Sequence, residues 1–251
     1  MLILLPPSEG KSAPDSGPRL DLAGLGFPEL GPTRRTLVSA LTSLCRTDPS
    51  AAATALGLGP RQLEEVRVNA ELRRRACAPA IEIYTGVLFD ALGYQSLTAA
   101  QQQRADEHVI VGSALWGLVR PDDLIPAYRL SGGTTLPELG SMRRAWHGPL
   151  AKALASLDGP VLDLRSGTYR DLAPLPQRDD WISIRVFEER NGRRTVVTHN
   201  NKATKGAIAR AMVSSRRNVS SLASLTSALS AWGYRVERES TAPDTLDVIV
   251  G

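Results

Sequence analysis

Lysine is rare in this chain, and its few positions are the first candidates for chemistry. The 251 residues include 30 lysines and arginines, of which only Lys11, Lys152, Lys202 and Lys205 are lysines. An arginine guanidinium stays protonated in a protein, whereas a buried lysine can lose its proton and act as a base or a nucleophile. We expect Lys11, Lys202 and Lys205, which lie in short polar motifs, to serve a site, and Lys152 to lie on a helix surface.

The first motif, Ser8-Glu9-Gly10-Lys11-Ser12, follows the apolar run Met1–Leu5 and two prolines. A Gly-Lys-Ser after a strand suggests a phosphate-binding P-loop, but the first glycine of that motif would have to stand at Leu5. What remains is a loop at the carboxyl end of a strand, which is a usual place for a ligand site. We favour that interpretation over a solvated loop.

The second lysine motif runs from Asn200 to Gly206, between an expected strand and an expected helix. If Thr204 caps that helix, Lys202 precedes its N-terminus and Lys205 lies in its first turn. Positive charge there opposes the helix dipole, but backbone N–H groups and ammonium groups together hold anions well. We therefore expect an anion-binding site, with two solvated lysines as the alternative.

Two prolines stiffen the segment 116–130, which presents Arg120, Asp122, Tyr128 and Arg129. Guanidinium groups bind phosphate or carboxylate through paired N–H donors. An Arg–Asp pairing that only orders the loop is the alternative. The expected anion ligands of the chain are Lys11, Arg120, Arg129, Lys202 and Lys205.

Ser166 and Tyr169 follow the expected strand Val161–Leu164. Ser166 has no Gly-x-Ser-x-Gly context, which argues against a serine hydrolase, so both residues are expected to form hydrogen bonds in the wall of a site. Tyr84, beside Gly86, either lines a site or packs within a helix. If the protein is an enzyme, its candidate catalytic residues are Lys11, Tyr84, Arg120, Tyr128, Ser166, Tyr169, Lys202 and Lys205.

The turn Leu56-Gly57-Leu58-Gly59-Pro60 joins two expected helices and matches the hairpin of helix-hairpin-helix DNA-binding modules. In that interpretation the backbone N–H groups at Gly57 and Gly59 bind phosphates, with Arg61 and Arg67 nearby. Such contacts position a protein on DNA without reading its sequence. Short glycine turns also arise by chance.

Strands and helices alternate without a strict βαβ rhythm, which favours an α+β fold. We expect one compact domain over residues 1–251, with a mixed β-sheet surrounded by helices and a helix-hairpin-helix-like segment at about 48–75. The Asn191-Gly192 pair predicts a hairpin. The main expected elements are strands at 1–5, 108–113, 161–164, 181–189, 194–199, 234–239 and 246–250, and helices at 33–47, 51–56, 61–75, 78–92, 146–156, 204–215 and 220–231.

Composition excludes several classes of protein. Apolar residues at 42% and charged residues at 22% are typical of a folded globular chain, and no apolar run reaches the length of a membrane span. Two cysteines and three histidines, without the spacing of metal ligands, predict no disulfide framework, metal or cofactor. The expected location is the cytoplasm. The net charge of +4 permits nucleic-acid binding without requiring it.

Taken together, the motifs resemble the YaaA family of peroxide-stress proteins over nearly the whole chain. The stretches that carry the resemblance are MLILLPPSEGK, IYTGVLFDAL, VGSALWGLVRPDDLIPAYRL, VLDLRSGTYRDL and RTVVTHNNKATKGAIAR. The resemblance implies a cytoplasmic protein that limits peroxide damage by restraining free iron, and that binds DNA through a helix-hairpin-helix element and a positively charged cleft. The residues that fall in the family's motifs are Lys11, Tyr84, Gly86, Arg120, Pro121, Tyr128, Arg129, Ser166, Tyr169, Lys202, Lys205 and Gly206.

Two functions therefore compete. The leading hypothesis is a stress protein that binds DNA largely without sequence specificity and helps limit iron-dependent damage. The alternative is an enzyme that acts on a small anionic substrate, a nucleotide or a carboxylate. Side chains gathered within one ligand's span of a closed pocket would favour the enzyme, whereas an open basic groove would favour DNA.

Overall fold

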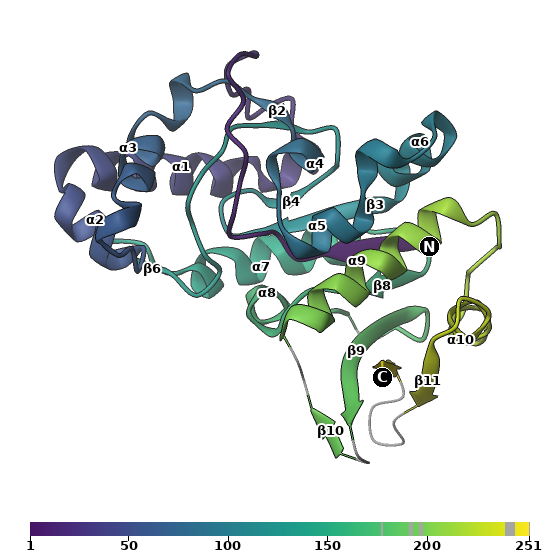
Figure 1. Cartoon of the computed structure of the whole chain (residues 1–251). Coiled ribbons are helices and arrows are strands. Elements are labelled where there is room, and N and C mark those ends of the chain that lie inside the picture. Colours follow the sequence, from purple (N-terminus) through teal and green to yellow (C-terminus); the bar gives the residue numbers. More distant parts are fainter. Residues whose placement is uncertain (177, 191–192, 196–197, 239–243, 251) are drawn as a thin grey trace.

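A mixed β-sheet runs through the middle of the protein (Figure 1). The computed structural model describes residues 1–176, 178–190, 193–195, 198–238 and 244–250. Within them the strand order of the main sheet is β11-β12-β9-β8-β1-β3-β4, and β10 pairs with β9. These strands are β1 (Leu2–Leu5), β3 (Val109–Ser113), β4 (Gly117–Val119), β8 (Val161–Asp163), β9 (Trp181–Arg190), β10 (Arg193–Thr195), β11 (Arg235–Arg238) and β12 (Thr245–Val250).

The centre of the sheet is parallel. Strands β12, β9, β8, β1 and β3 pair in parallel, while β4, β10 and β11 pair antiparallel to their neighbours. All of β3 and β8 and most of β1 are buried, as continuous apolar runs covered on both faces should be. In consequence the segments that follow β1, β3 and β8 leave the sheet at the same edge.

Helices and short two-stranded ribbons complete the described fold. The helices are α1 (Gly31–Thr47), α2 (Pro49–Ala55), α3 (Glu64–Ala70), α4 (Ala80–Ile83), α5 (Val87–Leu92), α6 (Ala99–His108), α7 (Met142–Ala155), α8 (Gly167–Leu172), α9 (Thr198–Ser214) and α10 (Leu222–Ala231). Single 3-10 turns span Pro28–Leu30, Pro60–Gln62, Leu72–Arg74 and Tyr94–Ser96. The ribbons pair β2 (Ala78–Pro79) with β5 (Leu124–Ile125), and β6 (Thr135–Leu136) with β7 (Gly140–Ser141).

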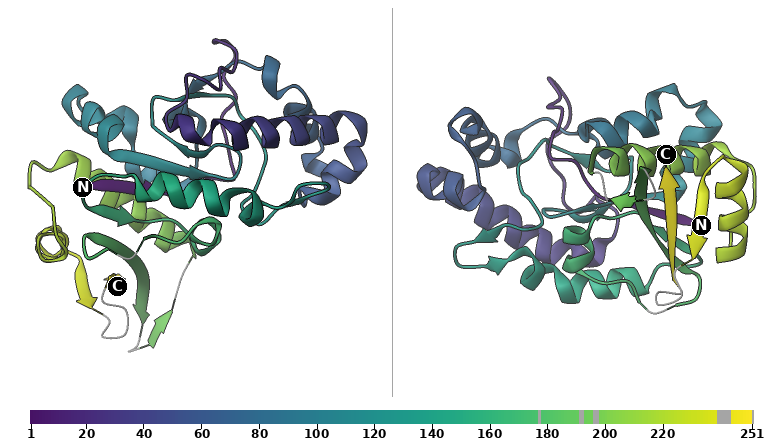
Figure 2. Two further views of the ribbon diagram at one scale, coloured as in Figure 1. Left: turned by 180° about the vertical axis from the view of Figure 1, so that it is seen from behind. Right: turned by 60° about the horizontal axis from the view of Figure 1, so that its bottom comes forward.

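The helices cover the sheet from both sides. Helices α5 and α9 lie in front of the sheet in Figure 1, and α7 lies in front when the molecule is seen from behind in Figure 2. Helices α1, α2 and α3 stand to one side, away from β11 and α10, in every view. Among the described helices, none is long and apolar enough to cross a membrane.

Close packing of α9 on α5 fixes the position of the residues that α9 contributes to the cavity described below. A Cβ atom at Gly206 in α9 would lie 2.1 Å from the Leu88 carbonyl oxygen and 2.9 Å from Ala91 Cβ. Only glycine allows the two helix backbones to approach so closely. The neighbouring residue on α9, Lys205, is therefore held at a fixed place relative to α5.

The structure confirms a single compact domain with a mixed sheet, and it corrects some expected elements. The helix expected at 78–92 is two short helices, because Tyr84 is extended and Gly86 has a φ of 92°. The extended backbone at Tyr84 instead forms an antiparallel bridge with Lys11. This tertiary pairing replaces the local helical preference.

The region after β10 also differs from the expectation. The strand expected at 194–199 is shorter, since β10 ends at Thr195 and α9 begins at Thr198. Strands β9 and β10 do pair antiparallel, but the expected Asn191-Gly192 turn lies outside the described residues.

Candidate functional site

A cavity of about 680 Å³ opens at the carboxyl edge of the parallel strands. Its lining residues belong to the loop after β1, the start of α5, the start of α8, the middle of β9 and the first turns of α9. Several of the expected site residues line this cavity, from segments far apart in the sequence. They are Ser8, Glu9, Gly86, Ser166, Tyr169, Lys202 and Lys205.

Lys205 is the most unusual charged group in the cavity wall. Its side chain is only 6% exposed, and its ammonium donates one hydrogen bond, 3.3 Å long, to the Arg165 carbonyl oxygen. An ammonium has three N–H donors, and a buried charge is costly unless it is paired. Lys205 therefore brings to the cavity a charge that the protein itself compensates poorly.

The nearest carboxylate is already committed to another cation. Asp163 and Arg165 are both fully buried and form a two-pronged ion pair, with Nε–Oδ1 and Nη2–Oδ2 distances of 2.9 and 3.1 Å. The Arg165 backbone N–H donates to the same carboxylate at 2.9 Å. Arg165 also donates to the carbonyl oxygens of Tyr169 and Ala173, which fixes α8 and the Ser166 loop.

The electrostatics of Lys205 follow from this arrangement. The pKa of Lys205 is lowered to about 8, mainly by burial and also by the positive charge of Arg170, while the carboxylate of Asp163 offsets part of the shift. Burial disfavours the charged form of an amine in this way. A small anion in the cavity would supply the missing charge and favour the ammonium form.

The structure corrects the local geometry expected for the second lysine motif. Thr204 does not cap a helix, because α9 begins at Thr198 and Thr204 is buried within it. Lys202 and Lys205 both lie beyond the first turn, three residues apart and thus on one face of α9. Lys202 is exposed at the mouth of the cavity, whereas Lys205 is buried in its wall.

Lys11 lies beside the cavity, under the loop that forms part of its wall. Its ammonium donates to the Ser8 carbonyl oxygen at 2.8 Å and stands 4.3 Å from the centre of the Tyr128 ring. Burial lowers its pKa to about 8; the carboxylate of Glu9 acts against the shift and the guanidinium of Arg129 adds to it. Lys11 is thus a second amine with a pKa near neutrality.

Two buried tyrosines and a serine form a hydrogen-bonded chain next to Lys11. The hydroxyls of Tyr84 and Tyr128 are 3.1 Å apart, and Tyr128 is 2.7 Å from Ser113 Oγ. Ser113 Oγ accepts from the backbone N–H groups of Leu115 and Trp116. With both its lone pairs used, Ser113 donates to Tyr128, and Tyr128 in turn donates to Tyr84. Burial raises the pKa of both tyrosines, so both stay protonated.

Arg129 connects the loop before Lys11 to helix α3. Its guanidinium pairs with the carboxylate of Glu9, and its backbone is held by Asn69 of α3 through bonds of 2.7 and 2.9 Å. Asn69 is fully buried. Arg129 is therefore an anchor of the loop before Lys11, and an anion entering there would compete with Glu9.

Arg120 does not join the other expected anion ligands. It follows β4, which is antiparallel to β3, and so it leaves the sheet at the opposite edge from Lys11. There it donates to the Glu107 carbonyl oxygen at 2.9 Å and lies 5.4 Å from the Phe27 ring. The Arg–Asp contact within this loop is a hydrogen bond that the Arg120 backbone N–H donates to Asp123.

The glycine hairpin joins α2 to a 3-10 turn and then α3, rather than to one helix over 61–75. The backbone N–H groups of Gly57, Leu58 and Gly59 donate to Thr54, Ala53 and the Gln62 side chain. Arg61 is exposed, whereas Arg67 forms an ion pair with Glu64 at 3.0 Å. The donors expected to hold phosphates thus have partners within the chain.

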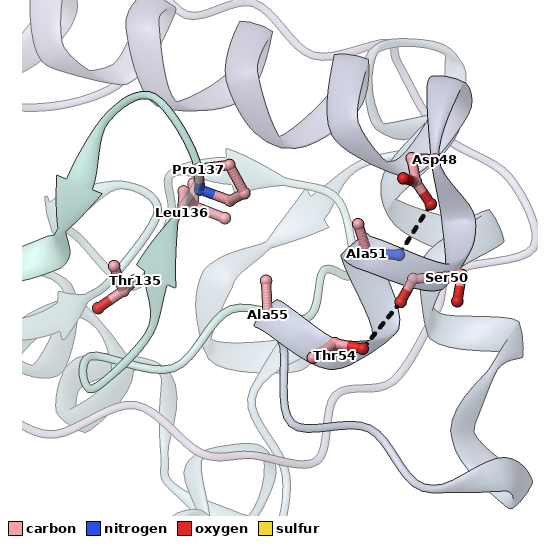
Figure 3. Close-up of a pocket in the computed structure, with 8 residues that line it drawn as sticks. All are labelled: Asp48, Ser50, Ala51, Thr54, Ala55, Thr135, Leu136 and Pro137. Atoms are coloured by element: carbon pink, nitrogen blue, oxygen red, sulfur yellow. Dashed lines mark hydrogen bonds between the residues drawn. The ribbon is translucent and has the colours of Figure 1, made fainter.

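A second, more open hollow of about 640 Å³ lies between α2 and the β6–β7 ribbon (Figure 3). Its charged residue, Asp48, accepts from the Ala51 N–H and caps α2. Thr54 donates to the Ser50 carbonyl oxygen. The lining contains no lysine, arginine or histidine, so this hollow lacks the chemistry of the larger cavity.

Three residues that matter to the site were not singled out from the sequence. Arg165 neutralises Asp163, Ser113 orients the tyrosines, and Asn69 holds the Arg129 backbone. Arg165 stands inside the motif that contains Ser166, and its place directly after a strand was the available signal. Ser113 and Asn69 act through long-range contacts that leave no local pattern.

Comparison with known proteins gives one consistent result. A family model described as peroxide stress protein YaaA matches residues 1–240. A UPF0246 protein of Streptomyces coelicolor is 43% identical over 259 residues, which cover 100% of this chain and 98% of that protein. A UPF0246 protein of Corynebacterium efficiens is 38% identical over 255 residues, which cover 100% of both chains.

Burial of the charged Lys205 side chain lowers the free energy of unfolding, so replacing Lys205 with an uncharged residue should make the protein more stable. At pH 7 the Lys205→Met variant should be about 1 to 3 kcal/mol more stable than the parent protein, because it no longer buries a charge. The gain should be full below pH 8, where folded Lys205 is protonated. It should vanish as pH rises to about 10.5, the ordinary lysine pKa, because the unfolded chain then also gives up this proton.

Urea unfolding from pH 6 to pH 10.5 measures this difference. Lys152→Met, a replacement of an exposed lysine on α7, should show no such pH-dependent gain. A Lys205→Met variant that is less stable than the parent at pH 7, or a difference that does not change with pH, would show that the charge is well compensated.

Proposed function

The chain belongs to the YaaA peroxide stress protein family, and we propose that it serves there by binding and transforming a small anionic substrate in the cavity at the sheet edge. One observation carries this proposal. Lys205, 6% exposed, belongs to the lining of a cavity of about 680 Å³, its ammonium donates to the Arg165 carbonyl oxygen, and the nearby carboxylate of Asp163 is bound by Arg165. A site with spare positive charge in a partly closed cavity suits a small anion better than it suits an extended polymer.

Lys11 supports the enzymatic part of the proposal. Perturbed pKa values in a cleft are typical of catalytic groups, and a pKa of about 8 is suited to proton transfer. We propose Lys11 as the acid or base, with Tyr84, Tyr128 and Ser113 fixing its surroundings.

The proposed link to peroxide stress is through this ligand. The family resemblance implies that the protein limits iron-dependent damage. Within the described ranges, no group of three or more His, Cys, Asp or Glu side chains is placed to hold a metal ion. We therefore assign any restraint of iron to the reaction in the cavity, by way of its substrate or product.

Anion binding should depend on pH through Lys205. Sulfate is a suitable probe, because its own charge is constant from pH 6 to pH 10. Its affinity, measured by isothermal titration calorimetry, should fall as pH rises through about 8, where Lys205 loses its proton. Binding at pH 7.5 should be accompanied by proton uptake, seen as a dependence of the heat on the buffer.

The Lys205→Met variant should lose most of the sulfate affinity and its pH dependence, and Lys152→Met should retain both. Equal binding by the parent protein and Lys205→Met would place the anion elsewhere and contradict the proposal.

DNA binding is the second candidate function, and the exposed hairpin is the observation in its favour. The turn between α2 and α3 keeps Gly57 at a φ of 63°, and Arg61 is exposed beside it. Against it, the hairpin N–H groups are paired within the chain, and Glu64 and Glu65 open α3 where a phosphate would bind. We therefore rank DNA binding below the small anionic substrate.

The hairpin can be tested directly with Arg61→Glu. If the hairpin binds DNA, fluorescence anisotropy with a 20-base-pair duplex should show an affinity that falls steeply with salt, and Arg61→Glu should weaken it about 10-fold. Arg216→Glu, a reversal of an exposed charge beyond α9, should have a smaller effect. No binding at 50 mM salt, or equal losses in the two variants, would overturn the hairpin assignment.

A further inference from the structure

The walls of the cavity differ sharply in chemistry. Lys202 and Lys205 of α9, with Ser166 and Thr168 at the start of α8, provide cations and hydroxyls. Apolar residues of α5 and β9 belong to the same lining, namely Val87, Leu88, Phe89, Ile184, Val186 and Phe187; along β9 the side chain of Phe187 points to the opposite face of the strand from those of Ile184 and Val186. A ligand that fills it must therefore carry an anionic part and an apolar part.

The apolar wall contains two aromatic rings. Phe89 is 7% exposed and stacks on Tyr84 with ring centres 5.3 Å apart, so it is held in place. Phe187 is half-buried, and the Arg185 guanidinium lies 5.4 Å from its ring. Flat faces of this kind pack well on a planar heteroaromatic ring.

The size of the cavity also decides between ligands. A volume of about 680 Å³ falls within the range of sites for whole small molecules, and an inorganic anion would fill only a small part of it. Glu9, the carboxylate of the lining, is bound by Arg129. A phosphate in this cavity thus meets ammonium groups rather than an unpaired carboxylate.

From these observations we infer that the anionic substrate is a nucleoside monophosphate, with its phosphate at Lys205 and Lys202 and its base against Phe187 and Phe89. This inference rests on the proposed function and adds the class of substrate to it. The hydroxyls of Ser166 and Thr168, which belong to the same lining, are assigned to the sugar. The same unit occurs free in the cell and within nucleic-acid strands.

Matched ligands separate the contribution of the base to binding from that of the phosphate. Isothermal titration calorimetry at pH 7 should show that AMP binds at least about 10-fold more tightly than ribose 5-phosphate. This is the gain in affinity expected when one base stacks on an aromatic side chain. Phe187→Ala should abolish this difference and leave ribose 5-phosphate binding unchanged. Lys205→Met should weaken both ligands, and circular dichroism should show that each variant is folded.

Three results would be decisive against the inference. Ribose 5-phosphate that binds as tightly as AMP would show that no base site exists, while the anion site itself stands. Octyl phosphate that binds as tightly as AMP would show that the apolar wall takes a flexible chain. If no phosphate compound binds, the proposed function fails together with this inference.

A last probe distinguishes the source of the nucleotide. If AMP binds more tightly than a deoxyadenylate trinucleotide, the substrate is the free nucleotide, as the enclosed volume leads us to expect. If the trinucleotide binds more tightly, the cavity takes one nucleotide of a strand, and the assignment to a free substrate is wrong.

Discussion

The buried ion pair between Asp163 and Arg165 is the interaction on which the site depends. Arg165 holds α8 against the end of β8 through the Tyr169 and Ala173 carbonyl oxygens, and it binds Asp163, the carboxylate that acts on the charge of Lys205. Breaking a buried pair leaves an uncompensated charge, which is strongly destabilising. In the folded protein Lys205 therefore lines the cavity, and the groups around it compensate its positive charge only in part.

The parallel sheet explains how one cavity gathers residues from five segments. Parallel strands end at a common edge, so the loops after β1 and β8 meet there, beside residues 184–187 of the longer strand β9. The close approach of α9 to α5 at Gly206 then places Lys205 in the opposite wall. A site built on packed elements in this way needs little rearrangement to receive a ligand. The spare charge on Lys205 is a cost in stability that only a bound anion offsets.

The sequence predicted much of this and missed what depended on tertiary contacts. The buried strands were clear because apolar runs covered on both faces have a strong local pattern. The helix expected at 78–92 was wrong because Tyr84 pairs with Lys11 across the fold. Arg120 was grouped with Lys11 although the antiparallel pairing of β4 sends it to the other edge. The direction of a short strand cannot be read from its composition.

Because the chain has few lysines, the pKa of Lys205 can be measured directly. Labelling with ¹³C,¹⁵N-lysine gives signals from only four side chains, so the pKa of Lys205 can be followed by NMR, with Lys205→Met for assignment. We expect a Lys205 pKa of about 8 in the free protein and a rise toward 10.5 when a phosphate ligand fills the cavity. A Lys205 pKa near 10.5 in the free protein, unchanged by AMP, would contradict it.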